Sequence, residues 1–486
     1  MTAQTILPAN SVVSGGYEVA NSARFNDGDS AYMHKTAAGG NRRTFTFSTW
    51  LKRGQLDTNQ QLFNCWSANN ASGFGYIQFV ATESNVIGNR ISLEVSGTQI
   101  LRSQQVLTDP NAWYHLVVAV DTTNDTANNR CRMYLNGTEI TSFAARNNPD
   151  ENFDFAFNQN NIDMYLGSNN YGGTKGNYFD GYLAETVWID GSQLAADSFG
   201  EFDSDSNIWK PIDVSGLTFG TNGFYLDYEA SGNLGNDVNG GTDLTEVNFA
   251  ATDQTTDTCT NNFAVINSLE NFFGKATLSE GNTRVLTNAG AEAMNTSSIA
   301  VSAGRWYFEV DFISNSGNVS RQCGITPTPS FATSAHGTGG DVTPHVHAYS
   351  DSGNLQTGNG SGGQTALATL SSFTNGDLIG IYLDLEDMKS YWSKNGTLMN
   401  SGTGIALTAL ASLPYGTGRY MFYVGDNNGA AQTCQANFGN PHVALDNTAV
   451  SDDNGYGAFE YSPNITGDGT AKSFYALCTK NVAEFG

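Results

Sequence analysis

Two Asn-Gly pairs constrain the fold of this chain strongly, because each lies between two short runs of strand-forming residues. Asn136-Gly137 separates residues 131–135 from 138–140, and Asn395-Gly396 has equivalent neighbours in the second half of the chain. The commonest two-residue hairpin turn needs a positive φ at both central positions, which Asn followed by Gly tolerates best. Each pair therefore predicts a tight antiparallel hairpin.

Alternation of apolar and polar residues predicts further strands along most of the chain. The clearest runs are residues 44–51, 76–80, 91–95, 115–120, 164–167, 181–189, 305–312, 377–384 and 419–425. The runs are short and closely spaced, and the 54 glycines supply many turn positions between them. We therefore expect an all-β protein with two antiparallel β-sandwich, jelly-roll-like domains.

The charge of the chain excludes two classes of partner. The formal net charge is −25, and Lys and Arg together number 22 against 47 acidic residues. Nucleic acids and anionic membranes are recognised by clusters of Lys and Arg, so we expect neither as a partner. No apolar run approaches the ~18 residues that a membrane-spanning helix needs, so we expect no membrane insertion. The first residues have neither the basic nor the apolar region of a signal peptide, and we expect none.

Six cysteines are spread along the chain without a C-x-x-C pair. At this low density a disulfide framework is not expected, and we predict buried, reduced thiols.

The composition divides the chain into five parts. We expect an N-terminal assembly segment at 1–20, a first sandwich at 21–228, a connector rich in Gly, Asn and Asp at 229–274, a second sandwich at 275–450 and a C-terminal segment at 451–486.

Helices are expected at few places. Val265, Ile266, Leu269, Phe272 and Phe273 have helical spacing, which predicts a short helix at the end of the connector. One or two helical turns are also expected within residues 194–199.

The first sandwich resembles a laminin-G-like domain of the concanavalin A-like superfamily. The resemblance rests on five pieces in the expected order, residues 25–32, 45–52, 113–117, 134–137 and 179–185. The second sandwich resembles a SPRY domain, through residues 304–310, 375–380, 391–396 and 436–439.

The pairing of the two sandwiches, with the segments 198–200, 222–227 and 257–263 near their join, resembles structural proteins of tailed phages. The resemblance implies a virion component made in the host cytoplasm: a tail or fibre protein, or a decoration protein of the capsid or tail. It further implies other virion proteins as partners and a homo-oligomer, for which a trimer is one option.

Glycoside hydrolysis needs two carboxylates that flank the scissile bond. The nearest match to the E-x-D-x-x-E motif of one concanavalin-like hydrolase family is Glu309-Val310-Asp311, which lacks the last carboxylate. We interpret Glu309 and Asp311 as outward-facing strand residues, and we predict that the chain is not an enzyme. A polysaccharide depolymerase is the weaker alternative.

Calcium is the one cofactor that the sequence suggests. Calcium prefers six to eight oxygen ligands. Asn26, Asp27 and Asp29 form a compact acidic turn, Asp180 lies in a second turn, and the resemblance to laminin-G-like domains implies a calcium ion at the sandwich rim. The alternative is that these are solvated turn residues.

Ligand binding is expected at two places. Tyr349, His345 and His347 adjoin two long predicted loops of the second sandwich, 326–344 and 350–364, and such loops on a rigid sandwich often carry recognition. As metal ligands the two histidines lack partners at fixed spacing, so we interpret them as exposed loop residues.

Tryptophans offer the second candidate. Trp66 precedes a polar segment and is the best candidate for an exposed stacking residue, whereas core packing is expected for Trp50, Trp113, Trp188, Trp306 and Trp392.

We therefore expect a non-catalytic phage tail or fibre component that binds a host-surface glycan or protein. The alternative is a capsid or tail decoration protein with a purely structural role.

Overall fold

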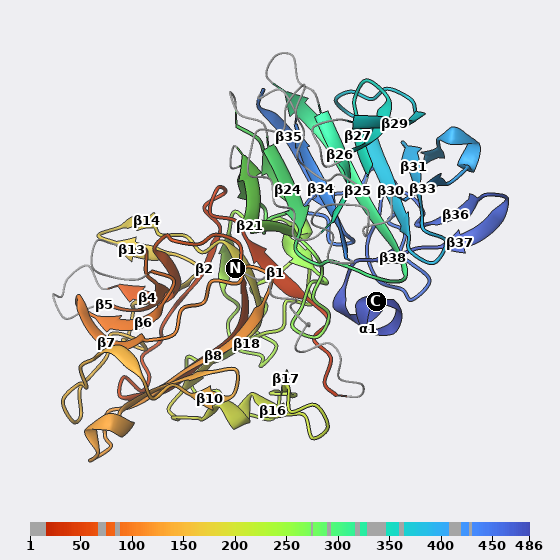
Figure 1. Ribbon diagram of the computed structural model, residues 1–486. Helices are drawn as coiled ribbons and strands as arrows, with labels where there is room; N and C mark the ends of the chain where they lie inside the picture. Colours follow the sequence, from red (N-terminus) through yellow and green to blue (C-terminus); the bar gives the residue numbers. More distant parts are fainter. Residues whose placement is uncertain are drawn as a thin grey trace. The chain divides into compact units, whose positions relative to one another are not determined.

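The computed structural model shows two compact units, which divide between Thr260 and Asn261 (Figure 1). The structure describes residues 16–66, 74–82, 88–273, 276–288, 293–315, 321–327, 347–358, 364–407, 419–426 and 430–486. Strands dominate both units, and the single α-helix of the described residues is α1 (Thr479–Phe485). None of these residues belongs to a helix long and apolar enough to cross a membrane.

The first unit contains two antiparallel sheets. In spatial order, one sheet consists of β10 (Thr138–Glu139), β9 (Cys131–Leu135), β8 (Trp113–Asp121), β3 (Thr44–Arg53), β15 (Gly181–Asp190), β1 (Ser22–Phe25) and β20 (Gln254–Thr255), with β18 (Phe224–Leu226) paired to β15. The other consists of β11 (Phe143–Arg146), β7 (Thr98–Ser103), β6 (Ile91–Val95), β5 (Phe74–Phe79), β4 (Gln60–Trp66), β12 (Asp163–Leu166), β2 (Tyr32–Thr36) and β19 (Thr245–Val247).

Short elements complete the first unit. They are the hairpin of β13 (Asn169–Tyr171) and β14 (Thr174–Gly176), the hairpin of β16 (Gly200–Phe202) and β17 (Trp209–Pro211), and the 3₁₀ turns η1 (Ala127–Asn129), η2 (Ala196–Ser198) and η3 (Ala251–Asp253). The turn η2 lies within residues 194–199, where one or two helical turns were expected.

The second unit repeats the two-sheet plan. One sheet consists of β21 (Ile266–Phe273), β24 (Ala293–Ser297), β34 (Tyr420–Asp426), β26 (Arg321–Pro327), β27 (His347–Ser350), β28 (Asn354–Gly358) and β29 (Gln364–Thr369). The other consists of β22 (Thr277–Ser279), β23 (Arg284–Leu286), β35 (Gln432–Asn437), β25 (Arg305–Asn315), β30 (Leu378–Asp384), β31 (Lys389–Lys394) and β32 (Thr397–Leu398), with β33 (Ile405–Ala406) paired to β31 and β38 (Tyr475–Ala476) to β25. The hairpin of β36 (Asn464–Gly467) and β37 (Thr470–Ser473) and the turn η4 (Asn400–Gly402) complete it.

The expected all-β architecture is confirmed, and so are both hairpins. The φ angles of Asn136 and Gly137 are 46° and 79°, and those of Asn395 and Gly396 are 48° and 74°. All four angles are positive, as the predicted turn requires. All six cysteines are buried and free, as expected.

One sheet of each unit is buried on both faces. In the first unit, Phe47, Val118 and Leu183 face the interior between the two sheets. Their neighbours Trp50, Val117, Ala184 and Val187 face the opposite side, where they pack against Phe199, Trp209 and Phe219. In the second unit, Tyr307, Tyr382 and Tyr391 pack likewise against Phe459, Phe474 and Cys478.

Two of the expected boundaries need correction, because the segments interpreted as a connector and a tail pair with the strands of the units or pack against them. Residues 229–260 belong to the first unit, where β19 pairs with β2 and β20 pairs with β1. Residues 451–486 contribute Phe459, Phe474 and Cys478 to the second unit. The expected helix around Leu269 is wrong, since these residues form β21 and pair with β24.

A buried ion pair holds the former connector to the first unit. Lys52 Nζ lies 2.7 Å from Asp257 Oδ2, and both side chains are fully buried. Trp113 Nε1 donates a hydrogen bond of 3.1 Å to the other carboxylate oxygen. Burial lowers the pKa of Lys52, and the carboxylate opposes that shift. The pair therefore ties β3 to a segment 205 residues further along the chain.

We predict that Lys52→Met destabilises the first unit by about 3–5 kcal/mol, because it leaves a buried carboxylate without its countercharge. Guanidinium unfolding of the full chain, followed by tryptophan fluorescence, measures the loss. The control is Asp154→Asn, which breaks the exposed pair of Arg43 and Asp154 and should cost less than ~1 kcal/mol. Equal losses in the two variants would contradict the assigned role of the buried pair.

Candidate functional site

The second sheet of the first unit has one face packed on the core and one face turned away from it. Cross-strand register aligns the side chains of the second face in rows. One row runs His34, Tyr165, Asn64, Tyr76, Glu94 across β2, β12, β4, β5 and β6. A neighbouring row runs Gln61, Gln78, Ser92, Arg102. These side chains, together with Trp66 and Phe74, are called the outer face below.

Aromatic rings form a continuous group at one end of the outer face. Trp66 and Phe74 are opposite one another on β4 and β5, and their rings stack with centroids 4.7 Å apart. The ring centroid of Tyr171, in β13, lies 4.6 Å from that of Trp66, and the ring centroid of Tyr76 lies 5.8 Å from that of Phe74. Tyr171 is 68% exposed, so the group reaches the surface.

Glu94 organises the polar part of the outer face. Its Oε1 accepts hydrogen bonds from Ser92, Gln78 and Arg102, and its Oε2 accepts one from the Tyr76 hydroxyl. Burial, and the charge of Glu94 next to it, raise the pKa of Tyr76. The tyrosine therefore stays a neutral hydrogen-bond donor, and the network holds its ring in a fixed position.

Several buried polar atoms of the outer face have no hydrogen-bond partner in the described part of the chain. They include Asn64 Oδ1, Gln61 Oε1, Trp66 Nε1 and Arg102 Nε. The side chains of Asn64 and Gln61 are only 2% and 4% exposed. A buried polar atom without a partner costs ~1–3 kcal/mol, so such atoms are usually satisfied. Both donors and acceptors lack a hydrogen-bond partner here, within a few residues of an aromatic group.

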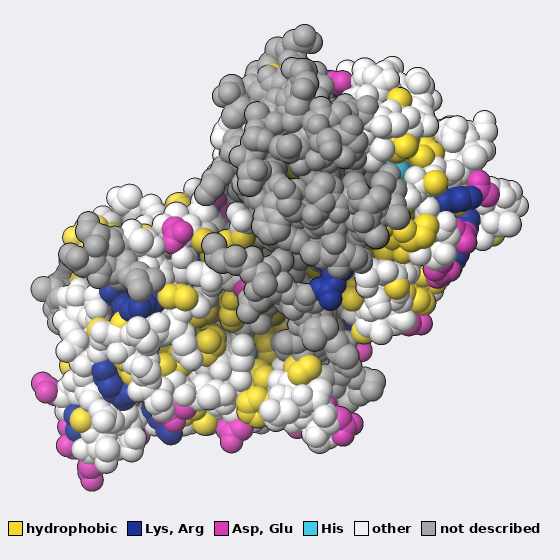
Figure 2. Space-filling view, viewed as in Figure 1, with side chains coloured by type: hydrophobic (Ala, Val, Ile, Leu, Met, Phe, Trp, Pro, Cys, Tyr) yellow, Lys and Arg dark blue, Asp and Glu magenta, His cyan; other side chains and the backbone are white. Residues whose placement is uncertain are grey.

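The face of the molecule drawn in Figure 2 is poor in charge, since its charged side chains are scattered singly or in small groups among uncharged ones. This agrees with a charged content of 14%. The outer face follows the same pattern, since its donors and acceptors are mostly amides, hydroxyls and an indole.

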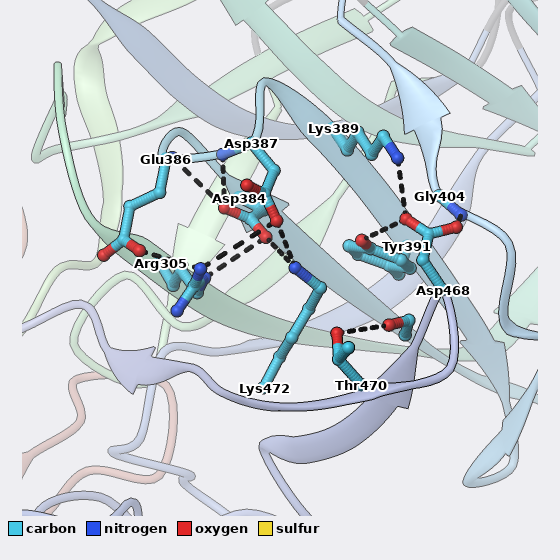
Figure 3. Close-up of polar contacts among 11 residues, drawn as sticks. Arg305, Asp384, Glu386, Asp387, Lys389, Tyr391, Gly404, Asp468, Thr470 and Lys472 are labelled. Atoms are coloured by element: carbon cyan, nitrogen blue, oxygen red, sulfur yellow. Dashed lines mark hydrogen bonds and ion pairs between the residues drawn. The ribbon is translucent and has the colours of Figure 1, made fainter.

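A second polar cluster lies in the second unit, where oppositely charged side chains face one another (Figure 3). Lys472 donates to Asp384 and Asp387, and Arg305 pairs with Asp384 at 3.2 Å. Asp468 accepts from Lys389 at 2.7 Å. The charges are paired with one another, and the contacts join the β36–β37 hairpin to β30 and β31. We assign this cluster a structural role.

The structure places the candidate residues of the second sandwich in its interior. His347 and Tyr349 are fully buried in β27, and His345 lies outside the described residues. His347 contacts Ser390 Oγ at 2.7 Å and the carbonyl oxygen of Ala406 at 3.1 Å, and burial lowers its pKa to about 4. The interpretation of His347 as an exposed loop residue is therefore wrong.

The segment 350–364 was expected to be one long loop. Its described residues instead form the end of β27, the turn after it, the strand β28 and the first residue of β29, and Leu355 is fully buried. The other expected loop, 326–344, lies outside the described residues apart from its first two positions.

Trp66 was expected to be exposed; it lies at the end of β4, is only partly buried, and its ring contacts Phe74 and Tyr171. The other tryptophans meet the expectation of core packing: Trp50, Trp113, Trp188, Trp306 and Trp392 are each at most 7% exposed.

The predicted calcium ligands lie near the end of β1. Asn26 follows Phe25, and Asp180 precedes Gly181, which pairs with Phe25. Asn26 Oδ1 accepts from the backbone of Gly28, and its Nδ2 donates to Asp29. Asp180 is turned toward Gly54, where a Cβ would lie 1.8 Å from its Oδ1. Among the described residues, no three Asp, Glu, His or Cys side chains form a group that could hold a metal ion. Asp27 and Asp29 thus do not converge with Asp180.

Glu309 was expected to face outward, and this is wrong. It is 1% exposed, and its carboxylate accepts from Tyr307, Asn437 and the backbone amides of Glu460 and Tyr461. These bonds hold the covering segment against β25. Burial raises the pKa of Glu309 to about 7, although the four donors oppose the shift.

Comparison with known proteins finds a match for part of the first sandwich. Residues 26–197 match the family model of the concanavalin A-like lectin/glucanases superfamily, in agreement with the sandwich fold of this part of the chain. No curated protein matches the sequence.

Several solved structures are similar to parts of the chain. The SPRY domain of human HERC1 is 20% identical, with a TM-score of 0.28 and coverage of 35% of this chain and 96% of that one. The SAP-like pentraxin of Limulus polyphemus is 12% identical, with a TM-score of 0.28 and coverage of 37% and 80%. Domain 4 of the arabinanase AbnA from Geobacillus stearothermophilus, solved with arabinotriose, is 19% identical, with a TM-score of 0.25 and coverage of 38% and 82%.

The raised pKa of Glu309 predicts a pH dependence of stability. The folded chain binds this proton more tightly than the unfolded chain, whose carboxyl has a pKa near 4.5. The stabilisation is therefore complete below about pH 4.5 and is lost as the pH rises through about 7. We expect Glu309→Gln, which stays neutral, to flatten the pH dependence of unfolding of the second unit between pH 5 and 8.

The comparison variant is Glu185→Gln in the first unit. Burial raises the pKa of Glu185 to about 7 as well, and its carboxylate accepts from Tyr225 at 2.7 Å. This variant should flatten the pH dependence of unfolding of the first unit and leave that of the second unit unchanged. A Glu309→Gln profile with the wild-type slope would contradict the assignment.

Proposed function

We propose that the chain binds carbohydrate on the outer face of the first sandwich. The observation that carries the proposal is the set of buried, unpartnered atoms of Gln61, Asn64 and Trp66 beside a continuous aromatic group. The match of residues 26–197 to a superfamily of lectins and glucanases supports the same class of ligand.

The chemistry of the face fits a sugar. Pyranose rings present apolar C–H faces, which pack against aromatic rings, and hydroxyl groups, which both donate and accept hydrogen bonds. The buried atoms without a partner include the acceptors Asn64 Oδ1 and Gln61 Oε1 and the donor Trp66 Nε1, so a hydroxylated ligand that reaches them would satisfy both kinds. Side chains held on strands are also ordered before the ligand arrives, which lowers the entropic cost of binding.

We propose further that the chain has no catalytic activity. Hydrolysis of a glycosidic bond needs one carboxyl group as acid and a second as base or nucleophile. On the outer face, both oxygens of Glu94 are already engaged by Tyr76, Ser92, Gln78 and Arg102. Release of reducing ends from a bound polysaccharide would support the depolymerase alternative instead.

The biological setting that we propose is a phage virion, in which the chain is a tail or fibre component that binds the host surface. This rests on the sequence pairing of a laminin-G-like block with a SPRY-like block and on the segments near their join. Other virion proteins and further copies of the chain are the proposed partners. A decoration protein of the capsid or tail remains the structural alternative, and it predicts no glycan binding.

Calcium stays a prediction. The contacts of Asn26 within its own turn give little support for a set of converging oxygen ligands. Thermal melting with calcium and with chelator tests it, since saturation at a hundredfold excess over Kd stabilises by ~2.7 kcal/mol.

The central prediction concerns Trp66. We expect Trp66→Ala to weaken binding of the best ligand on a glycan array by about tenfold, since a sugar that covers roughly 55 Å² of ring gains ~1.4 kcal/mol at ~25 cal/mol per Å². Asn64→Ala should weaken binding by a similar factor, because it removes a buried acceptor. Titration calorimetry of the full chain gives both affinities.

The control is Phe202→Ala, which removes another exposed aromatic ring of the same unit. Phe202 packs edge-on against Trp209, in the layer that covers the first sheet, and so lies off the outer face. Its variant should bind as the wild type does. Normal binding by a folded Trp66→Ala variant would place the site elsewhere, and no binding by the wild type would favour the decoration role.

A further inference from the structure

The β13–β14 hairpin contributes two different side chains to the outer face. Tyr171 of β13 extends the aromatic group beside Trp66. Lys175 of β14, which pairs with Asn170 across the hairpin, lies over the other end of the face. Its Nζ is 4.8 Å from the ring centre of Tyr165 and 5.9 Å from that of Tyr32.

Lys175 differs from most of the described lysines. Six others form ion pairs with carboxylates: Lys35, Lys52, Lys210, Lys389, Lys394 and Lys472. Lys175 has no carboxylate within ion-pair distance among the described residues, although the chain carries 47 acidic residues. Contacts with aromatic rings hold its ammonium group in place instead.

The acidic side chain at this end of the face is engaged elsewhere. Asp163 accepts hydrogen bonds from Thr36 at 2.5 Å and from Tyr165 at 3.0 Å, and lies 4.0 Å from His34. Next to Lys175, Asn170 Nδ2 donates to the Tyr165 hydroxyl, while Asn170 Oδ1 has no partner in the described part of the chain. A cation held over aromatic rings and a buried amide oxygen without a partner therefore belong to paired residues of one hairpin.

We propose that the glycan bound here carries an acidic sugar, whose carboxylate is recognised by Lys175. The inference rests on the proposed function and narrows its ligand class. The carboxylate would accept from the Lys175 ammonium, and a neighbouring hydroxyl would donate to Asn170 Oδ1. A charge-assisted hydrogen bond of this kind is about twice as strong as a neutral one.

The charge of the whole chain narrows the class further. At a net charge of −25 the protein repels a densely charged polyanion. One cation, beside an otherwise neutral aromatic and amide surface, suits a glycan in which an isolated acidic sugar is flanked by neutral ones.

The test uses an array on which each acidic oligosaccharide is paired with its carboxyl-reduced, neutral counterpart, so that the two differ only at the carboxyl group. The wild-type chain should bind the acidic member at least about tenfold more tightly. Lys175→Gln should lower the binding of the acidic member to the level of the neutral member. Lys175→Arg should keep most of the preference.

The control is Lys480→Gln, which removes a lysine that lies 5.6 Å from the ring of Tyr456 in the second unit. It should keep the wild-type preference. Equal wild-type binding to both members, or an unchanged preference in Lys175→Gln, overturns the assignment while the glycan site itself stands. Failure of the wild type to bind any member overturns the proposed function, and this inference with it.

Discussion

Burial of one sheet on both faces is the constraint on which the rest of this structure depends. Antiparallel sheets of a sandwich commonly pack one face on the core and leave the other in water. Here the sheet that contains β3, β8 and β15 has apolar side chains on both sides, and the sheet that contains β25, β30 and β31 has the same property. Each of these sheets needs a second layer of chain over it.

The second apolar face of each such sheet explains why segments between and after the sandwich strands pack against it. Asp257 lies far from β3 in sequence, and its buried pair with Lys52 fixes the end of the first unit against the sheet. Glu309 plays a similar part in the second unit, where it binds the backbone of Glu460 and Tyr461. With one sheet covered twice, the partner sheet of the first unit is the one whose outer face carries the polar rows and the aromatic group, and most of these polar side chains are themselves buried.

The sequence predicts local structure well and long-range register poorly. The Asn136-Gly137 turn and the strands around it follow from steric preferences of adjacent residues, and the structure confirms them. Spacing alone does not distinguish a buried strand from a helix, so β21 was expected to be helical. His347 and the run after it were interpreted as a loop because these residues are polar and rich in glycine. Such residues also occur in strands that tertiary contacts stabilise, so composition alone misplaced them.

The sequence predicted the candidate site only in part, because it does not show which strands pair with one another. Trp66 could be named because a large aromatic side chain beside polar residues is visible in the sequence. Asn64, Tyr165 and His34 are ordinary strand residues, and only cross-strand pairing brings them into one row. The alternation of the strands did carry a usable signal, since polar side chains recur on one side of β4, β5 and β6.

The accessibility of Trp66 tests the account most directly. The other six of the seven tryptophans are at most 7% exposed, so an aqueous quencher such as acrylamide reaches Trp66 far more readily than the rest. We predict that saturation with the best-bound oligosaccharide removes most of the quenchable tryptophan fluorescence, and that a Trp66→Phe variant shows little quenchable signal with or without ligand. Quenching that stays the same while the oligosaccharide is bound would contradict the claim that the outer face is the binding site.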